Sequence, residues 1–421
     1  EDGIRDQPRS RGLGDVYKRQ VEYGVELLRE LGKNTVLENM SEDRLREIVE
    51  KVNGVPKILE SIVGIIKNMP PWKISSDFKI EDIFTHKNIA LLFDEQIKSL
   101  RKEEIDILCT LALFHDYVSY NFLRRMYNEW EERTLDDCID NLIKQYLILF
   151  DSVQHAFYIT PIVADYILYS LKNPHSPIYT KIEREEIRNQ IKHRINKMVK
   201  LLEEARKPKE HWKSVEDIEV IIKEIELLLE AEEYERACEL LNEIDVDYLF
   251  VWGYYDMIQK FRLRMINHLK NAEKLALTYK SLGNTYYAQG EIENAREMYI
   301  KAIEYADKTN KKEIKGACYS NLGLCAIAEG KSIDAIEYLN KALDIAVETN
   351  YIKGKVIRHN YLGEAYFHLA DYKKALENFE TALRLATKIG EERYKAVALS
   401  NIAKALFKLG RTEDALTQLE E

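Results

Sequence analysis

Proline and glycine are scarce in this sequence of 421 residues, with 8 and 17 respectively. Both residues interrupt regular elements, so their scarcity favours long uninterrupted segments. The apolar residues recur mostly at helical spacing. Runs of about 18 apolar residues, which a membrane-spanning helix needs, do not occur. The chain is therefore predicted to be mainly α, with no membrane as a partner.

Cysteine is also rare, and the five cysteines are scattered without a C-x-x-C pair or a nearby His cluster. Each lies among apolar neighbours, which predicts buried free thiols in a reducing compartment and hence a cytoplasmic protein. Positive charge is not in excess, since the net charge is −10. A general nucleic-acid binder needs the opposite sign.

Catalytic motifs are missing from the sequence. The nearest match to the phosphate-binding pattern G-x-x-x-x-G-K-[ST] is LGKNT, where Leu27 replaces the first glycine and Asn34 the Ser or Thr. LILFD ends in Asp151 like the metal-holding strand of an NTPase, but it belongs to a predicted hairpin. There is no zinc spacing and no convincing triad. The chain is predicted not to be an enzyme, to hold no metal and to bind no cofactor by itself.

The first twenty residues differ from the rest, because they carry four arginines and no apolar periodicity. Within them, RSRGLGDVYKRQ resembles a translated sequencing-adapter tail. We therefore exclude residues 1–20 from the fold, and we expect the natural gene to continue upstream of Val21.

A repeat of 40 residues is the clearest signal in the chain. Its first feature is a large apolar residue followed by a small one, once in each repeat: Leu282-Gly283, Leu322-Gly323, Leu362-Gly363 and Ile402-Ala403. A turn residue follows in each repeat, at Gly290, Gly330, Ala370 and Gly410. A small residue comes next, at Ala295, Ala335, Ala375 and Ala415. Four residues later stands a large apolar residue, at Tyr299, Leu339, Phe379 and Leu419. The small residues allow two helices, A and B, to approach closely, and the large residue is expected to fill the gap to the next repeat. Such a unit needs neighbours to bury its apolar face.

This pattern resembles the tetratricopeptide repeat, in a version of about forty residues. The array is predicted to cover residues 271–421 and to be cut inside its last helix B. Residues 173–270 are predicted to form a helical connector with degenerate hairpins, in which Ala237 occupies a helix-B position. The open end of the array suggests possible self-association.

The middle of the chain, residues 99–172, predicts a winged-helix domain. Helices are expected at 103–114, 119–128 and 134–145, followed by a β-hairpin at 146–159 and a helix at 160–171. A winged helix often binds DNA through its third helix, but here that helix carries Asp136, Asp137 and Asp140 against Lys144 alone. The domain holds 7 Lys and Arg against 12 Asp and Glu, so no nucleic-acid partner is expected.

The order of a Gly-x-Pro step (Gly54 to Pro56), a winged helix and a repeat array resembles the STAND family of signalling ATPases. The resemblance implies that residues 21–98 are the remnant of a helical lid, that Pro56 packs on the adenine of ADP, and that Gly54 permits close backbone approach. Thr160 occupies the position of the histidine that contacts the β-phosphate in that family. ATP or ADP and Mg²⁺ would belong to the full-length protein. A plain helical turn remains the alternative for Gly54 and Pro56. For Thr160, a helix-capping role is preferred to a phosphate contact, with Pro161 as the first helical residue.

Binding is expected on the A helices, which line the concave groove in tetratricopeptide stacks and suit an extended peptide or a partner helix. The predicted groove residues are Lys280, Asn284, Tyr287, Ser320, Leu324, Ile327, Asn360, Glu364, Phe367, Ser400, Lys404, Phe407 and Lys408. Residues 272–421 carry 22 Lys and Arg and 22 Asp and Glu, which again disfavours nucleic acid. The leading hypothesis is thus a sensor fragment of a STAND-type ATPase that binds a protein or peptide. A stand-alone scaffold without nucleotide function and a winged-helix transcription regulator with a repeat sensor remain as alternatives.

Overall fold

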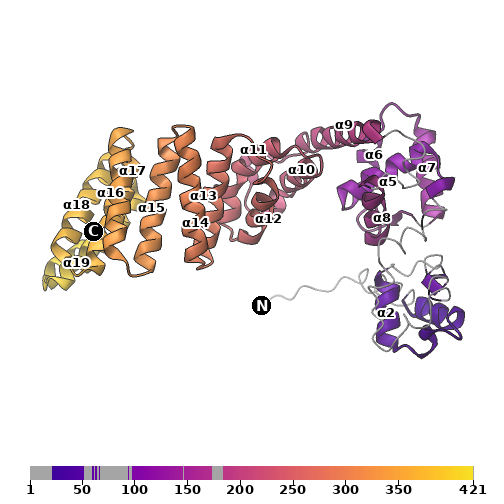
Figure 1. Cartoon of the computed structure of the whole chain (residues 1–421), viewed down its shortest axis with the longest axis horizontal. Helices are drawn as coiled ribbons and strands as arrows, with labels where there is room; N and C mark the ends of the chain where they lie inside the picture. The colour runs from indigo at the N-terminus through magenta and orange to yellow at the C-terminus, as the bar shows by residue number, and fades with distance from the viewer. Residues whose placement is uncertain are drawn as a thin grey trace. The chain divides into compact units, whose positions relative to one another are not determined.

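The structure, a computed structural model, describes residues 21–51, 97–145, 147–172 and 184–420, together with positions 59, 60, 62, 63, 66 and 93. The chain divides into two compact units, Glu1–Ala205 and Arg206–Glu421 (Figure 1). Each unit is described by itself below.

The first unit begins with a helix over residues 21–31, followed by the short helix η1 (Val36–Asn39) and α2 (Glu42–Lys51). Thr35 starts η1, because its hydroxyl accepts a hydrogen bond from the Leu37 backbone N–H. Leu28, Leu37 and Leu45 are fully buried, which gives these short elements an apolar core. Gly54 and Pro56 lie outside the described residues.

The next part runs α5 (Lys102–Phe114), β1 (Val118–Ser119), α6 (Tyr120–Met126), α7 (Glu132–Lys144), β2 (Leu149–Asp151), β3 (Ala156–Tyr158) and α8 (Pro161–Lys172). All five elements expected between 103 and 171 are present. Strand β1 was not expected, and it pairs with β3 to give an antiparallel sheet of order β1-β3-β2. A strand of two residues is too short to produce a sequence period.

Helix α7 has one apolar and one acidic face. Leu135, Cys138, Ile139 and Leu142 are buried, at helical spacing. Asp136, Asp137 and Asp140 are exposed on the other side. The Tyr120 hydroxyl donates to Asp136 at 2.7 Å. The exposed face of this helix is therefore negative.

Helix α9 (Arg184–Glu203) packs against α6 and completes the first unit. Its Arg194 forms an ion pair with Asp106 of α5. Lys197 Nζ lies 3.0 Å from the Glu129 carboxylate. Burial raises the pKa of Asp106, and the Arg194 guanidinium opposes that rise.

The second unit opens with the predicted connector, made of the short helices η5 (Lys209–His211) and η6 (Val215–Asp217), then α10 (Glu219–Glu230), α11 (Tyr234–Ile244), η7 (Asp245–Phe250) and α12 (Tyr255–Met265). Ala237 is fully buried, as its helix-B position requires.

The repeat array follows as four pairs of helices, and its 40-residue period is confirmed. The A helices are α13 (Ala272–Ala288), α15 (Lys312–Ala328), α17 (Ile352–His368) and α19 (Glu392–Lys408). The B helices are α14 (Ile292–Lys308), α16 (Ser332–Glu348), α18 (Tyr372–Ile389) and α20 (Thr412–Glu420). Figure 1 shows α13 to α19 stacked side by side along the unit.

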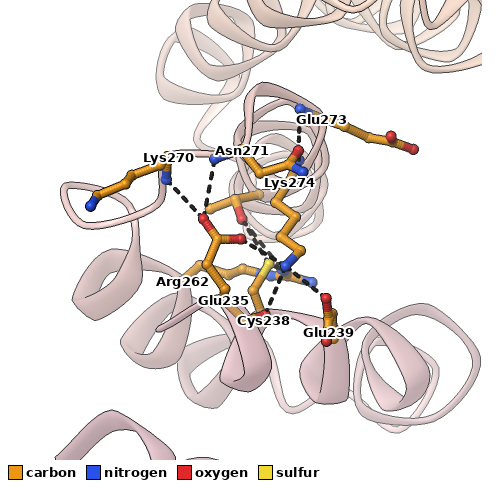
Figure 2. A network of polar contacts seen from close by, with 9 residues as sticks. Glu235, Cys238, Glu239, Arg262, Lys270, Asn271, Glu273 and Lys274 are labelled. Carbon is orange, nitrogen blue, oxygen red and sulfur yellow. Dashed lines mark hydrogen bonds and ion pairs between the residues drawn. The ribbon is translucent and has the colours of Figure 1, made fainter. Parts of the chain in front are cut away.

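Polar side chains join the connector to the first array helix (Figure 2). The Glu235 carboxylate accepts from the backbone N–H groups of Lys270 and Asn271, at 2.9 and 3.1 Å. Lys274 Nζ lies 2.7 Å from both Glu235 and Glu239. The Asn271 side chain caps α13 by accepting from the backbone N–H of Glu273 and of Lys274, which explains why the helix begins at Ala272.

Close contact between A and B helices depends on glycine. A Cβ on Gly283 would meet Tyr299 Cε1 at 2.5 Å, and a Cβ on Gly323 would meet Leu339 Cγ at 2.6 Å. The large residue therefore presses on the glycine of its own repeat. It also packs against the next A helix, since Tyr299 shares a core cluster with Cys318. The expectation that it only fills the gap between repeats was incomplete, because spacing alone does not show which helix lies beneath a side chain.

We expect Gly323→Ala to lower the free energy of unfolding by about 1–2 kcal/mol, because the new methyl group overpacks against Leu339. In a Leu339→Ala background, Gly323→Ala should instead raise the free energy of unfolding. There the methyl group fills empty space, and alanine favours the helix by about 1 kcal/mol over glycine. Urea titration of the four proteins measures both effects. Equal effects of Gly323→Ala in the two backgrounds would show that this contact does not limit the packing.

The turn between helices A and B needs a left-handed residue in every repeat. Gly290, Gly330 and Gly410 have φ values of 82°, 75° and 78°. Ala370 stands at the same position with a φ of 60°. A Cβ is disfavoured in this region, so the third repeat carries local strain that the other repeats avoid.

Ala370→Gly should therefore stabilise the protein by about 1 kcal/mol, which a melting curve or a urea titration measures. Gly330→Ala is the matched control, because no atom lies within 4 Å of a Cβ at that position and only backbone strain is introduced. It should destabilise by a similar amount. A stabilising effect of Gly330→Ala would contradict the strain assigned to Ala370.

Candidate peptide-binding face

Consecutive A helices contact one another along the array: α13 contacts α15, α15 contacts α17, and α17 contacts α19. The thirteen predicted groove residues all lie on these four helices. We call these thirteen residues the A face. Three equivalent positions recur on all four helices, so a ligand along the array would meet the same three kinds of position in turn.

The A face is graded in exposure. Lys404, Phe407 and Lys408 of the last repeat are exposed. Half-buried are Lys280, Asn284, Tyr287, Leu324, Ile327, Glu364, Phe367 and Ser400. Ser320 and Asn360 are buried.

The structure therefore corrects the prediction for Ser320 and Asn360, which do not lie on an open surface. The Ser320 hydroxyl donates to the Gly316 carbonyl at 3.0 Å, and Asn360 Nδ2 donates to the Val356 carbonyl at 3.4 Å. Both residues belong to inner repeats, which have a repeat on either side. Helical spacing identifies a face of the helix, but the neighbouring helices decide how much of that face they cover.

Asn284 has a structural role in addition to its place on the A face. Its side-chain carbonyl accepts from the Tyr299 hydroxyl at 3.0 Å and from Asn321 Nδ2 at 2.9 Å. These bonds join α13 to α14 and to α15. Burial raises the pKa of Tyr299, so its hydroxyl stays protonated and donates.

An apolar stripe crosses the A face, with one member from each repeat: Tyr287, Ile327, Phe367 and Phe407. Tyr287 packs on the core cluster around Tyr299, and Ile327 packs on the cluster around Leu339. Phe407, in the last repeat, is 62% exposed. Burial raises the pKa of Tyr287, so the stripe carries no charge at neutral pH. It offers apolar contacts at a spacing of one repeat.

One buried charge of the array was missed by the sequence analysis. Arg358 of α17 is 5% exposed, and the equivalent positions in the other repeats hold Thr278, Cys318 and Ala398. A charged residue among small ones at one repeat position was visible in the aligned repeats. This position lies outside the predicted groove positions.

Of the residues assigned to nucleotide by resemblance, Thr160 lies among the described residues, whereas Gly54 and Pro56 lie outside them. Thr160 is fully buried directly before α8, and its carbonyl accepts from the Ala164 N–H at 2.9 Å. Among the described residues its hydroxyl has no hydrogen-bond partner, so it makes no side-chain capping bond. The prediction that this hydroxyl caps α8 was therefore wrong, and a contact of Thr160 with nucleotide stays a prediction.

The five cysteines are free and buried, as predicted: Cys109, Cys138, Cys238, Cys318 and Cys325. Burial raises the pKa of Cys109 to about 11 and that of Cys318 to about 12, which disfavours the reactive thiolate. In the ranges that the structure describes, no cluster of three metal-ligating side chains occurs. None of the helices described there has the length and apolar character to cross a membrane.

The sequence of the array matches a known family. Residues 274–346 and 356–421 match the model of the tetratricopeptide repeat family. This part of the chain is therefore a tetratricopeptide repeat array within a mainly α protein. No curated protein matches the sequence.

Several solved structures are similar at low identity. A STAND protein with a tetratricopeptide repeat sensor from Pyrococcus horikoshii is 17% identical, with a TM-score of 0.36, over 95% of this chain and 58% of that one. The chain thus spans less than two thirds of that protein. Aspartyl phosphate phosphatase F from Bacillus subtilis is 14% identical, with a TM-score of 0.38, over 76% of this chain and 93% of that one. BtubC from P. vanneervenii is 17% identical, with a TM-score of 0.37, over 55% of this chain and 88% of that one. TM-scores this low identify no common overall arrangement.

We expect Asn284→Leu, which introduces the residue of the next repeat, to destabilise the protein by about 1–3 kcal/mol, because two donors lose their acceptor. Tyr299→Phe removes one of those donors. Asn284→Leu should therefore cost less in the Tyr299→Phe background, and chemical denaturation of the double-mutant cycle measures the difference. Equal costs in the two backgrounds would contradict the role assigned to the Tyr299 hydroxyl.

Proposed function

We propose that this chain is the sensor and regulatory part of a STAND-type signalling ATPase, and that its repeat array binds an extended peptide or protein segment along the A face. The observation that carries the binding part is the apolar stripe of Tyr287, Ile327, Phe367 and Phe407. Its members recur once per repeat, with polar side chains such as Asn284 and Glu364 beside them.

The spacing of this stripe suits an extended chain. Packed helices lie about 8–10 Å apart, and an extended strand advances about 3.3 Å per residue. Every third residue of a bound peptide would therefore meet the next member of the stripe. A peptide of about ten residues would cover the four repeats.

The ATPase part of the proposal rests on the order of features along the chain, from the Gly-x-Pro step through the predicted winged helix to the array. Catalysis would belong to the natural full-length protein, since this sequence contains no phosphate-binding loop. The coding sequence upstream of this segment tests that requirement, because it should encode a phosphate-binding loop. The acidic exposed face of α7 disfavours DNA as the partner.

A fluorescein-labelled pool of random decapeptides tests the binding part by fluorescence anisotropy. We expect Ile327→Ala to weaken binding about tenfold, because truncating a contact side chain that sits in a pocket costs more than 1 kcal/mol. Ile333→Ala is the matched control, since Ile333 lies in the same repeat but on helix B and is 74% exposed. It should leave binding unchanged.

Circular dichroism of both variants checks that they stay folded. Equal weakening by Ile327→Ala and Ile333→Ala, or no binding by the unchanged protein, would contradict the proposal that the A face binds peptides.

A further inference from the structure

Helix α13 meets the connector through a row of polar side chains. The row runs along one side of the helix to its C-cap, and its members are three or four residues apart, so they share one face. Every member forms a hydrogen bond or an ion pair with a residue of the connector. We call these five residues the polar seam: Lys274, Thr278, Ser281, Thr285 and Gln289.

The middle of the polar seam is buried. Thr278 is fully buried, and Ser281 is 4% exposed. Arg262 of α12 donates from Nη1 to the Thr278 hydroxyl at 3.3 Å and from Nη2 to the Asp245 carboxylate at 2.6 Å. The Ser281 hydroxyl donates to the same carboxylate. A buried ion pair of the connector is thus completed by two hydroxyl groups of the array.

Both ends of the polar seam are bonded to the connector as well. At one end, Lys274 forms the two ion pairs shown in Figure 2. At the other end, Gln259 of α12 donates from Nε2 to the Thr285 hydroxyl at 3.2 Å and to the Gln289 side-chain carbonyl at 2.7 Å. Polar contacts therefore run along the whole length of α13 on the side of the connector.

The other A helices carry mostly apolar or small residues at the positions of the polar seam. In α15 these positions hold Ile314, Cys318, Asn321, Cys325 and Glu329, and in α19 they hold Tyr394, Ala398, Asn401, Ala405 and Leu409. Cys318 and Cys325 belong to the apolar cluster around Tyr299, which joins the first repeat to the second. The junction between connector and array is therefore more polar at its centre than the junction that follows it.

A polar junction opens at a lower cost in free energy than an apolar one. Its polar groups form hydrogen bonds with water once they are exposed, whereas exposed apolar surface is unfavourable. A buried ion pair adds little stability, because the cost of removing both charges from water offsets most of their attraction. Arg262 Nε, moreover, has no partner among the described residues, so the closed junction leaves a buried donor unsatisfied.

The connector side of this junction includes an irregular helix. Helix η7 is a π-helix that directly continues α11, and its first residue is Asp245, which accepts from both Arg262 and Ser281. Such helices are rare and frequently lie at functional sites. The acceptor that holds the junction closed thus belongs to a segment with strained hydrogen-bond geometry of its own.

We propose that the polar seam is a hinge: the junction between α13 and the connector opens in the native protein, while the four repeats stay packed on one another. The array then moves as one body against α11 and α12. This inference goes beyond the proposed function and does not depend on it, because it concerns how the fold opens and not what the A face binds. If the polar seam served only to fix the register between connector and array, the junction would stay closed.

Two cysteines report on the two kinds of junction. Cys238 of α11 is fully buried beside the polar seam, with its Sγ 3.7 Å from the Thr278 hydroxyl. Cys318 is fully buried in the apolar cluster between the first two repeats, at the position that Thr278 occupies in its own repeat. A thiol reagent can reach each cysteine only when the surrounding junction opens.

Brief alkylation of the unchanged protein with N-ethylmaleimide, followed by mass spectrometry of its peptides, measures the reaction rate of both thiols in one sample. Each rate is divided by the rate in urea-unfolded protein. We expect Cys238 to react at least about tenfold faster than Cys318, as local opening below the global free energy of unfolding predicts. Equal protection of the two thiols, or slower reaction of Cys238, overturns the proposal.

Substitutions test the polar seam itself. Arg262→Met combined with Asp245→Leu replaces the buried ion pair by apolar side chains, so the reaction of Cys238 should slow about tenfold. Asp245→Asn alone leaves the Arg262 charge without its counter-ion and should speed the reaction. Arg264→Met is the matched control, because Arg264 lies on the same helix but is exposed. It should leave the rate at Cys238 unchanged, and Cys318 should keep its rate in all variants.

Circular dichroism checks that the variants are folded. An unchanged or faster reaction of Cys238 in the apolar double variant would show that the ion pair does not control the opening, and it overturns the proposal. Should the double variant not fold, Asp245→Asn decides alone, since an unchanged rate at Cys238 in that variant also overturns it.

Discussion

The contact between a glycine on helix A and a large side chain on helix B controls the geometry of the first three repeats. Gly283, Gly323 and Gly363 let Tyr299, Leu339 and Phe379 lie directly on the helix backbone. With the two helices this close, the same large side chains also reach the next A helix, so each repeat is packed onto its neighbour through the residue that closes it. The regular row of A helices, and with it the A face, depends on this contact.

Arg262 of the connector and Arg358 of the array are both buried charges, and their surroundings differ. Arg262 donates to Asn242 and Asp245 of the connector and to Thr278 of the first repeat, while its Nε has no partner among the described residues. Arg358 is surrounded by tyrosines and by space that two glycines leave open.

Sensing by such an array follows from its construction. Each repeat contacts its neighbours in sequence, so a ligand that spans several A helices couples their relative positions. The apolar stripe would provide contacts for such a ligand, one from each repeat. In a STAND-type protein, such a ligand would act on the nucleotide domain through the connector. The polar contacts of Glu235 and Lys274 are the described link between connector and array.

The sequence by itself determined the mainly α class and the 40-residue register, because glycine, alanine and large residues recur at fixed spacing and each has a local steric role. It also placed the acidic face of α7 correctly, since helical spacing separates Leu135 and Cys138 from the aspartates. Only the tertiary structure decided which A-face residues are accessible: Ser320 and Asn360 are covered by neighbouring repeats, and Asn284 is bound to Tyr299 and Asn321. The environment of Arg358 likewise depends on Gly316 and Gly354, which come from two different helices. Exposure and pairing arise from contacts between elements far apart in the chain, and no local period encodes them.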